Sequence, residues 1–203
     1  MARRGLGPVQ PCGRLRLPNR PSLVWRIAST MSAEDLRAKI REIPDFPKPG
    51  ILFYDITTLL KDPAAYRDAI DLMVEPHRDA GVDLVVGMES RGFIFSGPIA
   101  YKLHAGLIPV RKLGKLPAET VSVEYALEYG SNTLEIHKDA IRPGQRVLIV
   151  DDLLATGGTV RGTIELVERL EGQIVGLAFL VELLFLKGRD RLQGFKTTSV
   201  IQY

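Results

Sequence analysis

The stretch Val147-Leu148-Ile149-Val150-Asp151-Asp152-Leu153-Leu154-Ala155-Thr156-Gly157-Gly158-Thr159 decides the fold. Four aliphatic residues run into two carboxylates, and a turn of small residues follows. Apolar side chains then recur every three or four positions, which predicts an amphipathic helix over residues 160–170. A buried strand therefore delivers two acids to its C-terminal end, and a glycine turn opens the next helix.

The turn after the two acids predicts a phosphate site. Backbone N–H groups at a helix N-terminus attract anions, and the hydroxyls of Thr156 and Thr159 add further donors. Asp151 and Asp152 would repel a second phosphate but suit the vicinal hydroxyls of a ribose. The predicted ligand is a ribose 5-phosphate. Such a turn also occurs as plain turn chemistry in many α/β proteins, but the whole arrangement favours phosphate.

This pattern resembles the phosphoribosyl pyrophosphate (PRPP) motif of the type I phosphoribosyltransferases. The resemblance implies that the two acids and the turn bind PRPP. The residues so assigned are Asp151, Asp152, Ala155, Thr156, Gly157, Gly158 and Thr159.

Length and composition indicate an ordinary globular protein. A chain of 203 residues with 45% hydrophobic and 25% charged residues fits one domain with a real core. The only cysteine, Cys12, excludes an intrachain disulfide and suits a reducing compartment. The three histidines lack metal-ligand spacing, and no apolar run is long enough to cross a bilayer, so we expect no membrane partner.

The net charge of +3 comes from the first 30 residues, which hold six arginines and no acid. Without them the chain has 21 basic and 24 acidic residues, a net charge of −3 that gives no support for nucleic-acid binding. We expect residues 1–30 to be a leader and residues 31–203 to be the phosphoribosyltransferase domain. Two interpretations of the leader remain open. Its four prolines and few serines favour a disordered segment before a natural start at Met31, and its arginines suit an organelle transit peptide.

Strands and helices alternate along the chain, which predicts an α/β fold with a parallel sheet covered on both faces. Ligands of such sheets bind beyond the C-terminal ends of the strands. Residues 111–125 are predicted to be a long loop, and the alternation of residues 134–137 predicts a surface strand. Predicted helices cover residues 33–43, 63–80, 95–103 and 160–170, and predicted strands cover residues 51–56, 83–88, 107–110, 134–137, 146–150, 174–181 and 198–202.

A second loop follows another predicted strand and reads Glu89-Ser90-Arg91-Gly92. It places Arg91 at the same edge of the sheet as Asp151, and a guanidinium binds phosphate oxygens in pairs. Alone, Arg91 would be interpreted as a surface residue, but beside a ribose-phosphate loop it is expected to bind pyrophosphate. The family's pyrophosphate loop has this form and carries a cis peptide, which the resemblance assigns to the Glu89–Ser90 bond. Glu89 and Ser90 are assigned to the pyrophosphate loop with Arg91.

A third loop carries Arg111, Lys112 and Lys115, with no acid before Glu119. Alone, this run would be interpreted as a solvated charge cluster. Its place between two strands of the predicted sheet favours a mobile lid that closes over pyrophosphate.

Further motifs narrow the resemblance to the adenine phosphoribosyltransferase family and cover nearly everything after residue 30. The resemblance implies a central parallel sheet flanked by helices, with a small N-terminal hood and a flexible lid loop. The motifs that carry it are Ile43-Pro44-Asp45-Phe46-Pro47, Ser90-Arg91-Gly92-Phe93, the Arg111–Pro117 run, Leu127-Glu128-Tyr129-Gly130 and Leu180-Val181-Glu182-Leu183.

Two features argue for a 6-amino rather than a 6-oxo purine. Enzymes for hypoxanthine and guanine have a carboxylate in the phosphate loop where this chain has Ala155. They also use a lysine near the next strand, whereas here no lysine occurs there before Lys187. By resemblance Leu52, Tyr54 and Leu183 line the adenine slot, although many family members have arginine in place of Tyr54.

The resemblance implies the formation of AMP and pyrophosphate from adenine and PRPP in purine salvage. It implies a Mg²⁺ ion bound mainly through PRPP, with no protein ligand named, in a cytoplasmic homodimer. Glu128 is chosen for proton transfer at the purine, with Tyr129 beside it. Two rivals remain open: a phosphoribosyltransferase for another base, such as xanthine, and a non-catalytic protein that binds PRPP as a signal.

Overall fold

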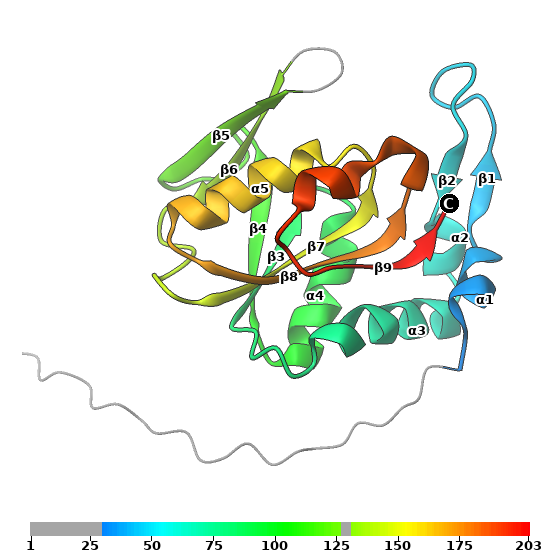
Figure 1. Cartoon of the computed structure of the whole chain (residues 1–203), viewed down its shortest axis with the longest axis horizontal. Coiled ribbons are helices and arrows are strands. Elements are labelled where there is room, and N and C mark those ends of the chain that lie inside the picture. Colours follow the sequence, from blue (N-terminus) through cyan, green and yellow to red (C-terminus); the bar gives the residue numbers. More distant parts are fainter. Residues whose placement is uncertain (1–29, 127–130) are drawn as a thin grey trace, which may run out of the picture.

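The computed structural model describes residues 30–126 and 131–203. Its main feature is a seven-stranded sheet in the order β5-β6-β4-β3-β7-β8-β9 (Figure 1). The strands β4, β3, β7, β8 and β9 run parallel to one another, as predicted, whereas β6 runs antiparallel to both β4 and β5. The elements are α1 (Ala33–Arg37), β1 (Arg41–Ile43), β2 (Phe53–Asp55), α2 (Thr57–Leu60), α3 (Pro63–Val74), η1 (Glu75–His77), β3 (Leu84–Met88), α4 (Gly92–Leu103), β4 (Gly106–Lys112), β5 (Thr120–Ala126), β6 (Ser131–His137), β7 (Arg146–Leu154), α5 (Gly158–Arg169), β8 (Gln173–Glu182), η2 (Leu184–Leu186), η3 (Gly188–Leu192) and β9 (Thr197–Gln202).

The central strands are buried on both faces, which explains their continuous apolar sequence. Alternate residues of a strand point to opposite faces, so Val85 and Leu148 pack with α3 and α4, whereas Val86 and Ile149 pack with α5. Figure 1 shows α5 on one side of β7 and β8, with α3 and α4 on the other. Each such side chain contributes roughly 1.5–3 kcal/mol when fully buried, so this two-sided core fixes the sheet.

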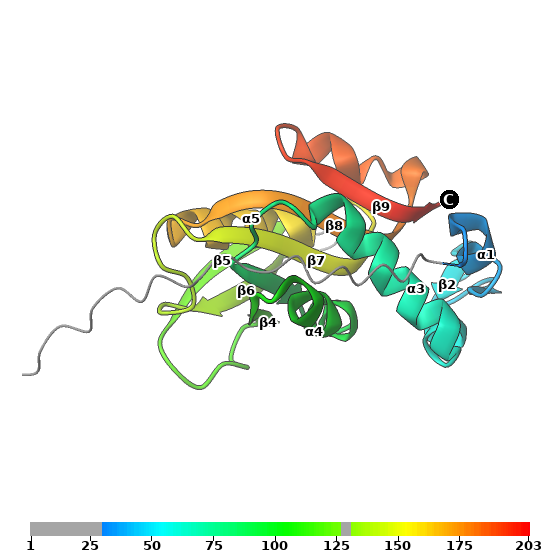
Figure 2. The same cartoon turned by 90° about the horizontal axis from the view of Figure 1, so that it is seen from below.

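The N-terminal hood consists of α1 and the antiparallel pair β1 and β2, and it lies beside α3 and β9 (Figure 2). The helix predicted over residues 33–43 is wrong in its second half, because α1 ends at Arg37 and Arg41–Ile43 form a strand. Ile43 precedes a proline, which disfavours helical backbone at that position. Leu36 and Ile40 are nevertheless buried as the helical pattern required.

The loop predicted over residues 111–125 is also wrong at both ends. β4 continues to Lys112, and Thr120–Ala126 form β5, which pairs with β6 along its whole length. Val123 is buried in the cluster around α5, and Val121 and Tyr125 pack against that cluster. These alternating apolar residues mark a strand whose inner face is covered by α5. The connecting loop is therefore confined to residues 113–119.

Helix α3 ends at Val74, short of the predicted end near residue 80. Pro76 has no N–H and disfavours helix in the residue before it, so the chain continues as the short 3₁₀ helix η1. His77 at the end of η1 is fully buried, and its Nε2 lies 2.9 Å from Thr198 Oγ1. Its Nδ1 has no partner among the described residues. Burial, with a smaller effect from Lys196, lowers the pKa of His77 to about 4.

We expect His77 to make the fold lose stability in mild acid. The unfolded chain takes up a proton near pH 6.5, whereas folded His77 does so only near pH 4, so acid favours unfolding between these values. Urea unfolding at pH 7.5 and pH 4.5 measures the loss, which should reach about 2–3 kcal/mol from this group. His77→Gln keeps a partner for Thr198 and removes the titration. An equal pH dependence in both proteins would contradict the assignment.

Candidate active site

Three neighbouring strands bring the three predicted loops to one edge of the sheet. β3 lies between β4 and β7, and all three are parallel, so their C-terminal ends lie side by side. Arg111 lies near the end of β4, Arg91 follows β3, and Asp151 and Asp152 lie near the end of β7. The predicted proximity of the arginine loop and the acid pair is confirmed, because Arg91 Nε lies 2.8 Å from Asp152 Oδ2.

The acid pair lies inside β7 rather than after it. β7 continues to Leu154 because β8 remains paired with it as far as Glu182. Asp152 is only 5% exposed and is paired with Arg91. Asp151 accepts a hydrogen bond of 2.9 Å from the backbone N–H of Asp152, and its carboxylate packs against Gly92, where a Cβ would lie 2.6 Å from Oδ1. Glycine at residue 92 therefore lets the two loops meet.

The pKa values of both carboxyls are raised. Burial, together with the neighbouring charge of Asp152, raises the pKa of Asp151 well above its usual range. Burial also raises the pKa of Asp152, opposed by the Arg91 guanidinium. Hydrogen bonds to the charged form stabilise it, so donating hydroxyls would stabilise the ionised pair.

The turn predicted to bind phosphate, residues 155–159, leads into α5 as the sequence predicts. The N-cap of α5 is Gly157 with φ of 79°, a left-handed conformation that favours glycine. No side chain caps this end, and the first turn of α5 contains no acid. The first N–H groups of a helix have no partner within it, so here they are available to an anion. Thr156 and Thr159 are half-buried at this end, and Gly157 and Gly158 are buried.

The loop after β3 has the predicted cis peptide between Glu89 and Ser90. The Glu89 carboxylate accepts hydrogen bonds from Arg111 Nε at 3.3 Å and Nη2 at 3.2 Å, and from the Lys112 N–H at 3.1 Å. The hydrogen bond from Arg111 is the main cause of the lowered pKa of Glu89. Glu89 therefore orients Arg111 and joins this loop to the end of β4.

The loop over residues 113–119 rests on a buried acid that the sequence pattern misplaced. Glu135 was expected on a surface strand, but it is 3% exposed. Its carboxylate accepts hydrogen bonds from the backbone N–H groups of Lys115 at 2.8 Å and Leu116 at 2.9 Å. The loop covers Glu135, while the side chains of Lys112 and Lys115 remain exposed.

Strand alternation separates the two aromatic residues of the hood. Tyr54 stacks on Tyr203 with ring centroids 3.8 Å apart, whereas Phe53 lies on the other face, its ring centroid 5.7 Å from the Arg91 guanidinium. Phe53 is thus the aromatic ring next to the acid edge. Phe53 was not among the predicted adenine-slot residues, although period-two alternation in Phe53–Asp55 was the available signal. The assignment of Tyr54 to adenine stays a prediction.

Leu183 and Leu52 differ in their surroundings. Leu183 is 8% exposed, and its N–H donates to the carbonyl of Leu154 at 3.0 Å, just before the phosphate loop. Leu52 is exposed on the hood. Glu128 and Tyr129 lie outside the described residues, in the four positions between β5 and β6.

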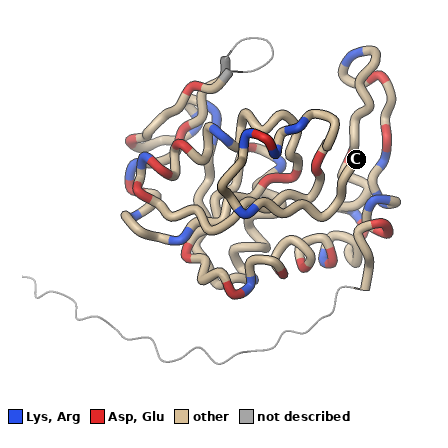
Figure 3. Tube along the Cα trace, in the orientation of Figure 1, with Lys and Arg blue, Asp and Glu red and all other residues tan. Residues whose placement is uncertain are grey.

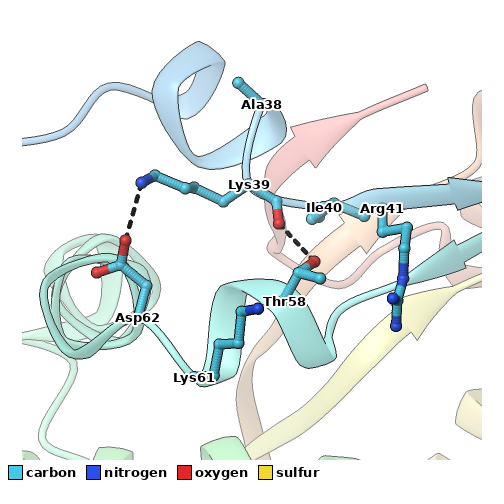
Figure 4. Close-up of a pocket in the computed structure, with 7 residues that line it drawn as sticks. All are labelled: Ala38, Lys39, Ile40, Arg41, Thr58, Lys61 and Asp62. Atoms are coloured by element: carbon cyan, nitrogen blue, oxygen red, sulfur yellow. Dashed lines mark hydrogen bonds and ion pairs between the residues drawn. The ribbon is translucent and has the colours of Figure 1, made fainter.

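A surface cavity of about 350 Å³ lies outside this edge, between the hood, α2 and the start of α3 (Figure 4). Two of its three cations are already paired, because Lys39 Nζ lies 2.8 Å from Asp62 and Arg41 binds Asp55. None of the predicted site residues that the structure describes lines it, and we assign it no ligand. The lining residues are Ala38, Lys39, Ile40, Arg41, Thr58, Lys61 and Asp62.

Acidic and basic residues are interspersed along the described chain (Figure 3). Within residues 30–126 and 131–203, no helix is long and apolar enough to cross a membrane. In the same residues no three histidine, cysteine or acidic side chains are grouped closely enough to hold a metal ion.

Comparison with known proteins identifies the family. A family model described as "Phosphoribosyl transferase domain" matches residues 55–196. The adenine phosphoribosyltransferase of Acidobacterium capsulatum is 58% identical over 174 residues, which cover 86% of this chain and 96% of that protein.

Two solved structures agree with this assignment. The adenine phosphoribosyltransferase of Rhodothermus marinus has a TM-score of 0.81 and 52% identity, covering 84% of this chain and 98% of that one. The enzyme of Saccharomyces cerevisiae, complexed with an imino-altritol bisphosphate and adenine, has a TM-score of 0.78 and 40% identity, covering 83% and 97%. The family model and these relatives show that this chain belongs to the adenine phosphoribosyltransferase family.

Proposed function

We propose that this protein forms AMP and pyrophosphate from adenine and PRPP. The observation that carries the proposal is the 2.8 Å contact between Arg91 and Asp152, which joins the arginine loop to the acid pair beside the phosphate loop. PRPP carries a 5′-phosphate, a ribose and a diphosphate in this order, and they match the phosphate loop, the acid pair and the arginine loop. The names of the relatives and the adenine bound in the yeast structure support the choice of base.

In the proposed reaction, purine N9 forms a bond to the anomeric carbon of PRPP while the bond from that carbon to the diphosphate oxygen breaks. The N–H groups of residues 155–159 hold the 5′-phosphate at the N-terminus of α5. Asp151 and Asp152 accept hydrogen bonds from the ribose hydroxyls and stabilise positive charge developing on the sugar ring.

Four cations stabilise the departing pyrophosphate: Arg91, Arg111, Lys112 and Lys115. Arg91 and Arg111 are held by Asp152 and Glu89, which reduces the motion that must be lost when the diphosphate binds. Lys112 is exposed at the end of β4, and Lys115 is exposed on the 113–119 loop, which we propose to act as the lid over the diphosphate.

Adenine is proposed to lie between Leu183 and the hood, where the candidate contacts are Leu52, Phe53 and Tyr54. Because Phe53 and Tyr54 lie on opposite faces of β2, only one of these two rings can stack on the base. Phe53 is added because its ring faces Arg91, and a flat purine stacks well on an aromatic ring. The N9 proton of adenine passes to the carboxylate of Glu128. Tyr129 adjoins this residue in the sequence.

We propose that Mg²⁺ binds mainly through the diphosphate and water. The carboxylates of Asp151 and Asp152 suit a diphosphate that carries Mg²⁺. They are buried next to each other, so a positive ion nearby would stabilise their charged forms. When bound, the ion would neutralise part of the diphosphate charge.

A panel of free bases tests the proposed function. Adenine, guanine, hypoxanthine and xanthine are each mixed with PRPP, Mg²⁺ and the protein, and nucleotide and pyrophosphate are measured. We expect turnover of adenine alone. Turnover of xanthine or guanine without adenine would overturn the base assignment, and PRPP binding without any turnover would favour a regulatory protein.

We also propose a homodimer that uses the outer face of α4. Ile94 and Tyr101 are exposed by 38% and 83%, and their spacing of seven residues places them on one side of the helix. Leu107 nearby in β4 is 46% exposed. Light scattering should give twice the mass of one chain for the wild type, and Tyr101→Glu should shift it toward one. A monomeric wild type would contradict this proposal.

Residues 31–203 are proposed to form the phosphoribosyltransferase domain and to work in the cytoplasm. The boundary is supported by Asp68, which is fully buried and accepts hydrogen bonds from Thr30 N, Thr30 Oγ1 and Met31 N, all within 3.0 Å. A chain beginning at Met31 would place an ammonium group on this carboxylate and keep the attachment.

We therefore expect deletion of residues 1–30 to leave kcat unchanged within about twofold and the melting temperature within a few degrees. The experiment compares full-length protein with deletions of residues 1–29 and 1–30, because only the shorter deletion keeps both Thr30 bonds. A large loss of kcat in both deletions would show that the leader belongs to the catalytic domain.

A further inference from the structure

A buried carboxylate at the end of β8 ties together three elements that contribute no proposed ligand. Glu182 is 2% exposed and accepts hydrogen bonds from both Nε and Nη2 of Arg189, the former at 2.9 Å. The Ser199 hydroxyl also donates to it. Arg189 in turn donates to the Thr197 carbonyl at 2.9 Å, so β8, η3 and β9 are held at one point.

The residue before Arg189 lies against the phosphate loop. A Cβ added to Gly188 would lie 2.1 Å from the Ala155 carbonyl oxygen and 3.1 Å from the Gly157 nitrogen. In the other direction, a Cβ added to Gly157 would lie 2.7 Å from the Gly188 carbonyl oxygen. Backbone therefore packs directly on backbone, and the start of η3 forms the support under the loop.

The same segment contains Leu183, which is proposed to line the adenine slot. Leu183 follows Glu182 directly, and its N–H bonds the Leu154 carbonyl immediately before the phosphate loop. Leu183 and Gly188 therefore lie in one segment, residues 183–188, between Glu182 and Arg189. The ion pair between Glu182 and Arg189 fixes both ends of this segment.

We infer that Glu182 and Arg189 are positioning residues that hold Gly188 under the phosphate loop and Leu183 beside it. This inference rests on the proposed function and adds a coupling between the PRPP and adenine subsites. A buried ion pair is a weak source of stability compared with apolar packing, because desolvation of the charges offsets their attraction. The two hydrogen bonds from the planar fork of the Arg189 guanidinium, in contrast, fix its orientation and its distance relative to the Glu182 carboxylate.

The first test is Gly188→Ala, which keeps both residues of the ion pair and places a Cβ against the Ala155 carbonyl. The φ angle of Gly188 lies outside the left-handed region, so alanine introduces the contact and no backbone strain. The matched control is Gly162→Ala in α5, where the new Cβ would meet atoms at an ordinary 3.5 Å. We expect the PRPP KM to rise at least about tenfold in Gly188→Ala, since a misplacement of 1 Å can cost about a hundredfold, and to stay near wild type in Gly162→Ala.

The second test removes the fork with Arg189→Lys and Arg189→Met. The control is Lys102→Met, which breaks the partly buried pair with Asp71 between α3 and α4. We expect faster amide hydrogen exchange at residues 155–159 and weaker binding of ribose 5-phosphate in both Arg189 variants, more so with methionine. The Lys102 variant should show neither change. If Arg189→Met does not fold, the PRPP KM of Gly188→Ala and the hydrogen exchange and ribose 5-phosphate binding of Arg189→Lys still test the inference.

Failure of this inference can be told apart from failure of the proposed function. A wild-type protein that turns over no base would defeat the function, while ribose 5-phosphate binding and hydrogen exchange still test the positioning role. An active wild type whose Arg189 and Gly188 variants keep the PRPP KM, ribose 5-phosphate affinity and exchange rates would overturn the inference. Lower melting temperature alone, with unchanged exchange at residues 155–159, would assign the pair to stability only.

Discussion

Glu128→Gln is expected to lower kcat at least about a hundredfold, because general acid–base catalysis is typically worth 10²–10⁴ in rate. Adenine must lose its N9 proton, or enter as the tautomer protonated at N7, before its nitrogen can attack. A carboxylate beside the base accepts or donates that proton, and glutamine does neither. The PRPP KM should change little, since the substitution removes an interaction made in the transition state.

The competing explanation for Glu128 is a simple ion pair with a lid cation such as Lys115. An exposed ion pair is worth at most about 1 kcal/mol, which corresponds to less than about tenfold. Glu119→Gln is the matched control, because Glu119 is an exposed acid paired with Lys138 at 3.0 Å. Steady-state kinetics with Glu128→Ala, Glu128→Gln and Glu119→Gln separates the two. A loss below tenfold in Glu128→Gln would leave that residue a positioning role only.

Asp151→Asn and Asp152→Asn are expected to weaken PRPP use far more than adenine use. Each lost hydrogen bond to a charged group costs roughly 1.5–3 kcal/mol, or about 10- to 150-fold in the PRPP KM. The structure adds a distinction between the two. Asp152→Asn also weakens the hold on Arg91 and should therefore impair pyrophosphate binding, whereas Asp151→Asn should affect the sugar alone.

Kinetics with varied PRPP and varied adenine measures this difference, and inhibition by pyrophosphate reports on the arginine loop. Asp139→Asn, an exposed residue after β6, is the control for a lost carboxylate. We expect weaker pyrophosphate inhibition in Asp152→Asn than in Asp151→Asn. A collapse of adenine affinity with normal PRPP use would contradict the assignment of these acids to ribose.

The sequence predicted most of what local chemistry controls. Continuous apolar runs identified the buried strands β3, β7 and β8, and the small-residue turn identified the N-terminus of α5. Because parallel strands end at a common edge, the sequence also placed Arg91 beside the acid pair, which the ion pair with Asp152 confirms. These features depend on a few neighbouring residues and on one general rule of sheet geometry.

Other features depended on which distant segment covers a given face. The strand Thr120–Ala126 was missed because its alternating apolar residues acquire meaning only when α5 packs on them. Glu135 was placed on the surface because the pattern of β6 does not reveal that the backbone of residues 115 and 116 binds it. Covering segments from elsewhere in the chain decided both outcomes.

The sequence by itself determined the buried central strands, the glycine turn before α5 and the charged groups at that edge of the sheet, because backbone geometry and side-chain chemistry act within a few residues. Only the tertiary structure decided that Phe53 rather than Tyr54 faces Arg91, and that Gly188 supports Ala155 from more than thirty residues away. Those contacts join segments whose separation in sequence carries no periodic signal. They form because close packing leaves one backbone conformation in which the hood, η3 and the phosphate loop all fit.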